Sequence, residues 1–397
     1  MNILYFLGSF PRLSQSFVLN EIYELDRRGH SVVVCARNQP DEPIVHEEYD
    51  QLDIPIHYVD EPIKTDLSEL LSSVSISPRV LSGLNYKASI KDRIARLIQT
   101  RWCVDIFDSL DWSPDHVHSH FASKKAFTGK HIADYYGVPF TLTTHAYDIY
   151  NAPVGVYTAD LLRATDRIVT ISDYNRRYIR NQFTDKTPID VVHAGIRPEK
   201  FEPTDESVPG RVFTVSRFVE KKGLRYALEA VALAVEQTDI EYHIVGSGEL
   251  EADLRKRVER LDLNNYVSFL DNVSDELLIT EFDEACCFLL PCVVAESGDR
   301  DGIPVALMEA MAMETPPVTT TVSGIPELVD HEKNGLLTEP RDPEVTADAL
   351  VRILEDDEFR MLCGSKAREK VSEEFNITDE AEKLEKTFEM ARETRNR

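Results

Sequence analysis

The chain has 397 residues, and its 42% hydrophobic content is enough to build a core in each of two ordinary domains. Its formal net charge of −26 at pH 7 disfavours nucleic acid as a partner, because phosphates would be repelled over almost the whole surface. No run approaches the ~18 to 20 apolar residues of a membrane span, and the first ten residues lack the basic start and cleavage site of a signal peptide. We therefore expect a cytoplasmic protein.

The N-terminal half alternates apolar, strand-like runs with helical patterns. Residues 2–7 form an apolar run that ends in the loop starting at Gly8, and a helical stretch then leads to Gly29 and a β-branched run at 31–35. Further strands are expected at 116–120, 140–144, 167–171 and 190–192. Strands that alternate with helices predict a parallel sheet covered by helices on both faces.

A break in the pattern follows. Residues 198–210 hold three prolines and no hydrophobic period, which predicts an interdomain linker. The alternation then restarts, with strands expected at 212–216, 242–245, 266–270 and 287–291. The last helical segment carries an apolar stripe at helical spacing, made of Ala381, Leu384, Phe388 and Ala391. We expect domains at 1–197 and 211–375, a linker at 198–210 and a final helix at 376–397.

Two open α/β sheets bind ligands at the carboxyl ends of their strands, so we expect the chemistry between the domains. In the second domain, Pro304 suits the first turn of a helix, and residues 301–303 would form the loop at its N-terminus. Free amides and the positive end of the helix dipole would bind phosphate or sugar oxygens, and Glu309 would bind a ribose diol. The alternative is that Asp301 only caps the helix and Glu309 is a solvated acid.

Two cations in the same domain suit a diphosphate. Arg217 follows a predicted strand and Lys222 precedes a predicted helix, so both lie where charge on a departing nucleoside diphosphate can be neutralised. No carboxylate cluster of the kind that holds Mg²⁺ is evident, and a solvated basic turn is the alternative. The glycines of residues 245–249 resemble only half of a dinucleotide fingerprint, so no nicotinamide or other cofactor is expected.

Histidines mark the candidate site of the first domain. His145 leaves a predicted strand and is expected to donate to a sugar hydroxyl, with Asp148 orienting it or the acceptor. A purely structural histidine is the alternative. His118 lies between His116 and His120, at the alternation that places strand residues on one face, which raises the question of zinc. No carboxylate or cysteine lies close in sequence, so we predict no metal site there.

Together these motifs resemble the retaining nucleotide-sugar glycosyltransferases of family four, in particular the exopolysaccharide branch of colanic-acid-type enzymes. The resemblance covers nearly the whole chain. It is carried by the motifs at 14–21, 118–121, 145–149, 193–196, 216–223 and 298–311. It implies two Rossmann-like domains that face each other across a cleft, the GT-B fold, with the acceptor on the first domain. It also implies that the C-terminal helix packs back on that first domain.

The resemblance also assigns roles to residues of the second domain. It implies that Arg217 and Lys222 hold the donor diphosphate and that Glu309 holds the ribose. The donor sugar would be contacted by the Asp301 side chain and by the amides of Gly302 and Ile303. The family usually has glutamate at both ends of this step, whereas this chain begins it with the shorter Asp301.

In the first domain, the resemblance places His145 over the reacting sugar. Gly8, Ser16, His118 and Asp148 would lie near the acceptor or line the cleft. The segment from Ser14 to Ser16 departs from the family's commoner Ser-Glu-Thr.

The predicted function is therefore retaining transfer of a sugar from a UDP- or GDP-sugar to a glycan or lipid-linked acceptor. A nucleotide-sugar 2-epimerase of the same architecture and a non-catalytic binding subunit are the alternatives. The segment from Arg79 to Arg101 holds six basic residues against one acid, and as an amphipathic helix it would lie on an anionic membrane. This hypothesis predicts peripheral contact with the inner face of the cell membrane, although a solvated helix is the alternative.

Overall fold

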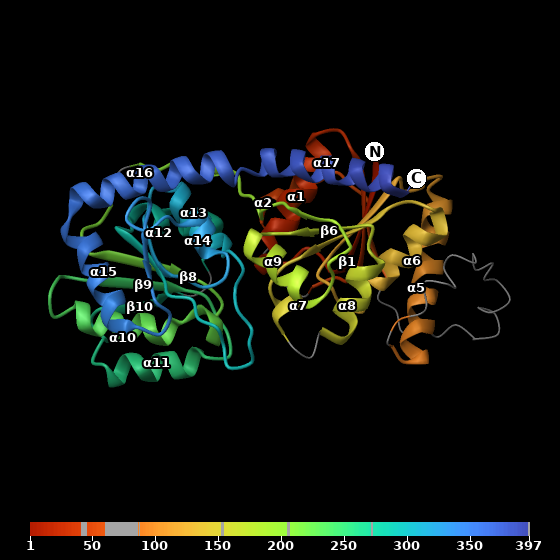
Figure 1. Ribbon diagram of the computed structural model, residues 1–397. Helices are drawn as coiled ribbons and strands as arrows, with labels where there is room; N and C mark the ends of the chain where they lie inside the picture. The colour runs from red at the N-terminus through yellow and green to blue at the C-terminus, as the bar shows by residue number, and fades with distance from the viewer. Residues whose placement is uncertain are drawn as a thin grey trace. The chain divides into compact units, whose positions relative to one another are not determined.

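The computed structural model describes residues 1–40, 46–59, 86, 88–151, 155–204, 207–270 and 273–395. The chain divides into two compact units (Figure 1): residues 1–193 with 380–397, and residues 194–379. Each unit holds a wholly parallel sheet among its described residues, as the alternation of strands and helices predicted. The boundary between the units falls at residue 193, four residues before the boundary expected from the sequence.

The sheet of the first unit has the strand order β3-β2-β1-β4-β5-β6-β7. Its strands are β1 (Asn2–Ser9), β2 (Ser31–Asn38), β3 (Ile56–Tyr58), β4 (His116–His120), β5 (Phe140–Thr144), β6 (Arg167–Thr170) and β7 (Ile189–Val191). The chain runs outward from β1 to β3 and then returns to the other side of β1 with β4. This reversal of strand order beside β1 is where open parallel sheets bind ligands.

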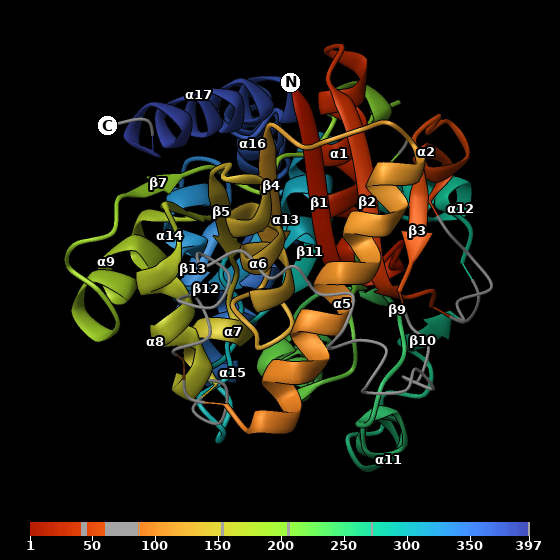
Figure 2. The ribbon, with the colours of Figure 1, turned by 90° about the vertical axis from the view of Figure 1, so that its right-hand side faces the viewer.

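Helices cover both faces of this sheet (Figure 2). They are α1 (Ser16–Arg27), α2 (Glu47–Asp50), α5 (Ile90–Ser109), α6 (Phe127–Tyr136), α7 (Tyr147–Tyr150), α8 (Gly155–Ala164) and α9 (Asp173–Gln182), with a 3₁₀ turn η1 at Leu13–Gln15. Alternate residues of β1 serve different cores: Leu4 packs with α5 and α6, whereas Ile3 packs with α1 and the C-terminal helix α17 (Ile377–Arg395). This period of two is the consequence of strand geometry.

Helix α17 is anchored to the first unit along its length. The four residues of its apolar stripe are all buried, and Phe388 stacks on His116 with ring centroids 4.1 Å apart. Glu385 accepts hydrogen bonds from Arg28 at 2.7 and 2.8 Å. Arg395, at the last turn, donates to Asp134 and Asp166. In both ribbon views the N-terminus lies beside this helix (Figures 1 and 2).

The sheet of the second unit has the order β10-β9-β8-β11-β12-β13. Its strands are β8 (Arg211–Val215), β9 (Glu241–Val245), β10 (Val267–Leu270), β11 (Cys287–Leu290), β12 (Pro317–Thr320) and β13 (Leu336–Thr338). Its helices are α10 (Leu224–Ala234), α11 (Glu251–Arg260), α12 (Asp275–Glu284), α13 (Val305–Ala312), α14 (Ile325–Leu328), α15 (Pro343–Glu355) and α16 (Asp357–Glu374), with 3₁₀ turns η2 (Pro198–Lys200) and η3 (Glu220–Lys222). The strand order reverses beside β8.

The segment predicted as a linker, residues 198–210, is held on the second unit instead. Phe201 is buried in that unit's core, and its carbonyl accepts a hydrogen bond from Arg368 at 2.6 Å. Thr204 donates its backbone N–H to Asp283 at 2.8 Å. The prolines and acids hide this docking from a sequence pattern, because one aromatic side chain and a few hydrogen bonds create no period.

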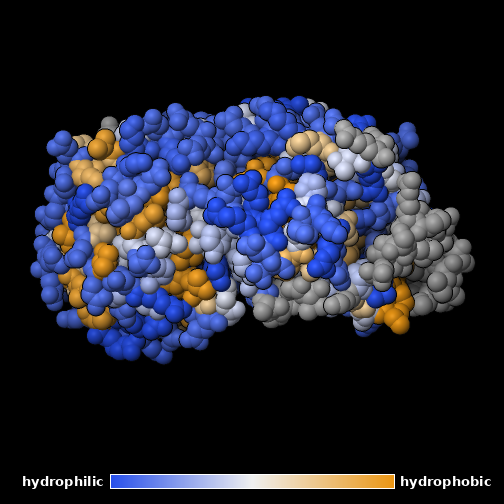
Figure 3. Space-filling view, viewed as in Figure 1, coloured by the Kyte–Doolittle hydropathy of each residue, from blue (hydrophilic) through white to orange (hydrophobic). Residues whose placement is uncertain are grey.

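The described part of the basic segment turns several of its charges inward. Arg79 and Lys87 lie outside the described residues, Arg96 is only 6% exposed, and Arg93 donates to the carbonyl of Tyr86 at 2.6 Å. Arg101 pairs with Asp105 on the same helix. Figure 3 shows a hydrophobic patch at one end of α5, where Ile90 is 77% exposed. Membrane contact by this segment therefore stays a prediction that rests on fewer charges than the sequence suggested.

Replacement of Phe388 by alanine tests how α17 stabilises the first unit. We expect Phe388→Ala to lower the free energy of unfolding of this unit by about 3 to 5 kcal/mol, because it removes a fully buried ring and leaves a cavity. Met390→Ala, on the exposed side of the same helix, is the matched control and should cost less than about 0.5 kcal/mol. Both tryptophans, Trp102 and Trp112, belong to the first unit, so fluorescence during urea unfolding reports on it alone. Equal midpoints for the two variants would contradict the packing described above.

Candidate active site

A row of histidines lies at the centre of the first unit. His116, His118 and His120 alternate along β4, and each is at least 95% buried. His116 and His118 both contact the hydroxyl of Thr141 on β5 at 2.7 Å, and the second ring nitrogen of His118 contacts Thr143 at 3.0 Å. Burial lowers the pKa values of His116 and His118, which keeps both rings neutral. His118 is thus fully buried and fully bonded, rather than placed on an open surface as its expected role near the acceptor would require.

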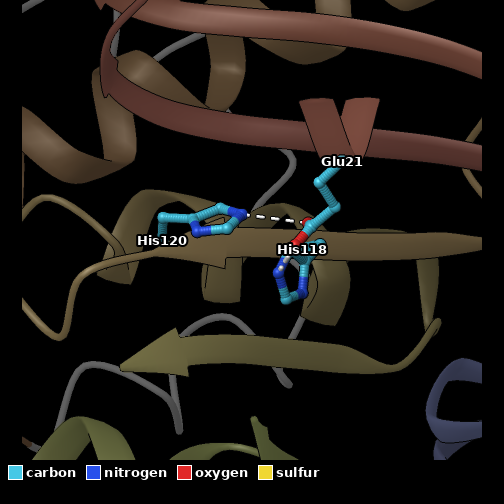
Figure 4. Close-up of side chains that lie close together, drawn as sticks. All are labelled: Glu21, His118 and His120. Atoms are coloured by element: carbon cyan, nitrogen blue, oxygen red, sulfur yellow. Dashed lines mark hydrogen bonds and ion pairs between the residues drawn. The ribbon is translucent and has the colours of Figure 1, made fainter. Parts of the chain in front are cut away.

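Helix α1 supplies a carboxylate that the sequence gave no reason to expect here. Glu21 lies against β4 (Figure 4), and its Oε1 accepts from the hydroxyl of Tyr5 at 2.6 Å and contacts Nε2 of His120 at 3.0 Å. Burial, followed by the charge of Glu21, raises the pKa of Tyr5 well above its ordinary value, so Tyr5 is the donor. The same carboxylate oxygen lies 3.7 Å from Nε2 of His118.

Glu21, His118 and His120 bring three possible ligand atoms within 4.8 Å of one another. The prediction of no metal site rested on the absence of a nearby carboxylate in the sequence, and the fold supplies one from α1. Both ring nitrogens of His118 and both of His120 already have partners among the described residues. We assign no metal to this cluster, because an ion would have to replace those contacts.

His145 lies just beyond the carboxyl end of β5 and is 7% exposed. Its Nε2 is 3.0 Å from Nδ1 of His120, and the rings of Phe17 and Phe121 pack on it with centroids 4.6 and 4.5 Å away. Asn175 donates to its backbone carbonyl at 2.7 Å. The ring and the backbone of this histidine are therefore both held in place.

Asp148 acts on the backbone of His145 rather than on its ring. Its two carboxylate oxygens accept from the N–H groups of Ala122 at 2.7 Å and of His145 at 3.0 Å. The carboxylate is 1% exposed, and burial raises its pKa to about 6 despite these bonds. The sequence led us to expect that Asp148 orients His145 or the acceptor, and its contact with His145 runs through the main chain.

Gly8 and Ser16 complete the predicted set in the first unit. Gly8 lies near the end of β1, where an added Cβ would be 3.7 Å from the side chain of Lys125, and Ser16 begins α1. Because the strands are parallel, the ends of β1, β4 and β5 share one edge of the sheet with His120 and His145. The sequence assigned no role to Asn175, placed Glu21 only at the end of the 14–21 motif, and raised His120 only as a possible zinc ligand and within the 118–121 motif.

The second unit buries a cluster of opposite charges. Asp301 is 9% exposed, and its carboxylate lies 2.7 Å from Nζ of Lys222 and 3.3 Å from Nζ of Lys221. Lys221, which the sequence did not single out, is 5% exposed and also contacts Asp299 at 3.3 Å. Burial alone would raise the pKa of Asp301, but Lys222 and Lys221 outweigh it and hold that pKa well below the usual range. Burial likewise opposes the charge of Lys221, yet Asp301 and Asp299 raise its pKa.

Close backbone contacts position these lysines. Gly223, directly after Lys222, has φ of 69°, and a Cβ there would lie 1.8 Å from the carbonyl oxygen of Pro291. Gly246 likewise approaches the carbonyl of Ser216, where a Cβ would be 1.9 Å away. Only glycine permits both the positive φ and the approach. The glycines of the 245–249 turn therefore pack one loop against another.

Arg217 follows β8 and is exposed, and within the described residues no carboxylate pairs with its guanidinium. The neighbouring amides of Gly302 and Ile303 donate to no acceptor in the described part of the chain. They precede α13, whose N-cap is Pro304 without a side-chain hydrogen bond, so Asp301 is not the cap of this helix. Glu309 is half-buried within α13. A free cation and free amides beside a helix N-terminus are the features that bind phosphate.

The fold resembles that of glycosyltransferases of the GT-B class. HepE from Anabaena, solved in complex with UDP, gives a TM-score of 0.74 at 17% identity over 98% of this chain and 100% of its own. Sucrose-phosphate synthase from Thermosynechococcus elongatus also gives 0.74, at 18% identity over 98% of each chain. These likenesses confirm the predicted class of two Rossmann-like domains.

The sequence comparisons identify the family. Residues 14–200 match Glycosyltransferase Family 4, and residues 196–370 match Glycosyl transferases group 1. A protein named as the colanic acid biosynthesis glycosyltransferase WcaL of Salmonella typhimurium is 30% identical over 95% of this chain and 96% of its own. The chain therefore belongs to the family 4 glycosyltransferases. Within it, the amylovoran biosynthesis glycosyltransferase AmsK of Erwinia amylovora is 29% identical over 95% of this chain and 96% of its own, so the predicted branch is confirmed.

Replacement of Asp301 by asparagine tests the buried cluster. We expect Asp301→Asn to destabilise the second unit by about 3 to 5 kcal/mol at pH 7, because it removes the nearly buried carboxylate that both Lys221 and Lys222 contact. Asp299→Asn is the matched control and should cost less, since among the described residues the carboxylate of Asp299 pairs with Lys221 alone, and it is more exposed than that of Asp301. Because the pKa of Asp301 is depressed on folding, its stabilisation is complete above the unfolded value of about 3.9 and is lost as the pH falls below it.

The measurement is calorimetric unfolding at several pH values. Calorimetry detects the unfolding of both units, whereas tryptophan fluorescence follows the first unit alone. The calorimetric transition that fluorescence does not show therefore belongs to the second unit. The difference in the free energy of unfolding between wild type and Asp301→Asn should become smaller below about pH 4. A difference that does not change with pH would show that the charge of Asp301 contributes nothing to stability.

Proposed function

We propose that this glycosyltransferase transfers a sugar from a nucleoside-diphosphate sugar to a glycan or lipid-linked acceptor, with retention of anomeric configuration, in polysaccharide synthesis. The observation that carries the proposal is the arrangement of Lys221, Lys222 and Arg217 beside the free amides that precede α13. The related WcaL and AmsK are named for colanic acid and amylovoran synthesis. These names support a polysaccharide as the product.

The donor roles follow from charge. Arg217 is the exposed cation and would bind the diphosphate directly, while Lys222 would share its charge between the diphosphate and Asp301. The amides of Gly302 and Ile303 would stabilise charge on the departing diphosphate or bind the donor sugar, and Glu309 would bind the ribose. HepE was solved with UDP-glucose, and a related mycobacterial mannosyltransferase is named for GDP-mannose, so both bases are represented among similar proteins.

Retention is proposed to proceed by attack on the face that the leaving group occupies. A double displacement would need a carboxylate nucleophile. Asp148 does not suit that role, because it is buried and both its oxygens accept backbone hydrogen bonds. Asp301 is equally occupied by two lysines. The role proposed for His145 is a contact with the reacting sugar.

Diphosphate binding is the first test. We expect calorimetry with UDP, GDP and ADP in the presence of EDTA to show one preferred ligand. Arg217→Ala should weaken that binding by about 10-fold or more, because it removes a charge-assisted hydrogen bond worth ~1.5 to 3 kcal/mol. Lys222→Ala should also weaken it, and Lys256→Ala, an exposed lysine on α11, should not.

Two outcomes would redirect the proposal. Failure to bind any diphosphate would favour the non-catalytic subunit that the sequence left open. Binding accompanied by interconversion of the donor sugar without an acceptor would favour the 2-epimerase, a reading that the relatives do not support.

Peripheral membrane contact is a further part of the proposal. No helix of the described residues is long and apolar enough to cross a membrane. Lys91 and the exposed Ile90 at the start of α5 would meet an anionic surface at the inner face of the cell membrane. We expect Lys91→Glu to reduce co-sedimentation with phosphatidylglycerol vesicles, whereas Lys256→Glu should leave it unchanged. Equal sedimentation of the two variants would rule out contact through this end of α5.

A further inference from the structure

A chain of hydrogen bonds links three titratable side chains of the first unit. Oε1 of Glu21 contacts Nε2 of His120 at 3.0 Å, and Nδ1 of His120 contacts Nε2 of His145 at 3.0 Å. The three residues come from α1, from β4 and from the loop after β5, so only the fold brings them together. In each of these two hydrogen bonds one atom must donate and the other must accept. The position of the proton in one bond therefore determines its position in the other.

The carboxylate at one end determines where those protons lie. Glu21 can only accept, and it already accepts from Tyr5, so the proton of the next link must belong to Nε2 of His120. A neutral His120 then has a lone pair on Nδ1 and can only accept there. The second link therefore requires that Nε2 of His145 carries its proton, which leaves Nδ1 of His145 as an acceptor.

The surroundings favour a neutral His145. Burial, followed by the proximity of His120, holds the pKa of His145 well below its ordinary value. The other titratable groups that face the chain are Tyr5, which is a donor to Glu21, and His118, whose nitrogens are bonded to threonines. Asp148 faces it only through backbone N–H groups. An extra proton on His145 would have to be buried against this preference.

Nδ1 of His145 is the last atom in this series of hydrogen bonds, and it is available to a ligand. None of the described residues bonds to it, and it is not among the buried polar atoms without a partner, so solvent reaches it. Phe121, whose ring packs on His145, has φ of 67°, a conformation that costs about 1 to 3 kcal/mol in a residue other than glycine. Strain of this kind persists where the surrounding structure fixes a functional group.

We propose that Glu21 and His120 are positioning residues that hold His145 with its proton on Nε2, so that Nδ1 accepts a hydrogen bond from a ligand hydroxyl. That the hydroxyl belongs to a sugar rests on the proposed function. The inference reverses the role that the sequence suggested for His145, which was to donate to a sugar hydroxyl. It also gives Glu21 a function without any contact with the ligand.

Nitrogen NMR of histidine-labelled protein tests the proton positions without any substrate. In the wild type we expect coupling across the hydrogen bond between Nε2 of His145 and Nδ1 of His120, with the proton attached to His145. In Glu21→Gln the amide can donate as well as accept, so part of the population should carry that proton on His120. His116→Gln is the matched control, because His116 is equally buried on the same face of β4 but lies outside the chain.

A wild-type spectrum with the shared proton on His120, or a Glu21→Gln spectrum identical to wild type, would overturn the proposal. Spectra of His145→Gln and His120→Gln assign the signals. Tryptophan fluorescence confirms that each variant retains a folded first unit, since both tryptophans lie there.

Ligand binding separates this inference from the proposed function. Glu21→Gln should bind the preferred free diphosphate as wild type does, because the diphosphate is proposed to bind the second unit. The second quantity is the ratio of the affinity for the matching nucleotide sugar to the affinity for the free diphosphate. In Glu21→Gln this ratio should be about 2- to 10-fold lower than in wild type, because one hydrogen bond to the sugar is weakened. An unchanged ratio would overturn the proposed role, whereas failure of every protein to bind diphosphate would overturn the proposed function alone.

Discussion

Each buried polar group of this protein needs a partner, and the carboxyl edges of its two parallel sheets are where that constraint is most demanding. In the first unit, histidines and a carboxylate meet at the ends of β1, β4 and β5, and each ring nitrogen that is cut off from solvent there is bonded. In the second unit, a nearly buried aspartate is balanced by two lysines. The loops of the second unit approach so closely that Gly223 and Gly246 have no room for a Cβ. Packing and electrostatics are therefore coupled at that edge.

Much of the fold was predictable because it depends on local pattern. Parallel strands buried on both faces give continuous apolar runs, and nearly every predicted strand lies within a residue or two of an observed one. The apolar stripe of α17 was visible at helical spacing, and its four residues are buried. Phe201 shows where pattern fails. A single aromatic side chain that docks among prolines produces no period, so the segment around it resembled a free linker.

The candidate sites were predictable to the extent that they lie in short motifs. Arg217, Lys222 and Asp301 belong to contiguous motifs that a reader of the sequence can find. Glu21 and His120 do not interact through sequence proximity, since 99 residues separate them, and only the pairing of β1 with β4 beneath α1 creates their contact. Lys221 was missed for another reason. Two adjacent lysines look alike in a sequence, and only the structure shows that both contact Asp301 and that Lys221 is the more buried of the two.

The shorter Asp301 is explained by these two lysines. Residues with a short carboxylate reach less far, and here both Lys221 and Lys222 extend to it, so the carboxylate is satisfied within the protein. Lys221, Lys222 and Arg217 set three positive charges beside the carboxylates of Asp299 and Asp301. Three cations so close together stand out on a chain of net charge −26. At physiological ionic strength distant charges are screened over about 8 Å, so a diphosphate close to Arg217 responds to these cations more than to the acidic surface as a whole.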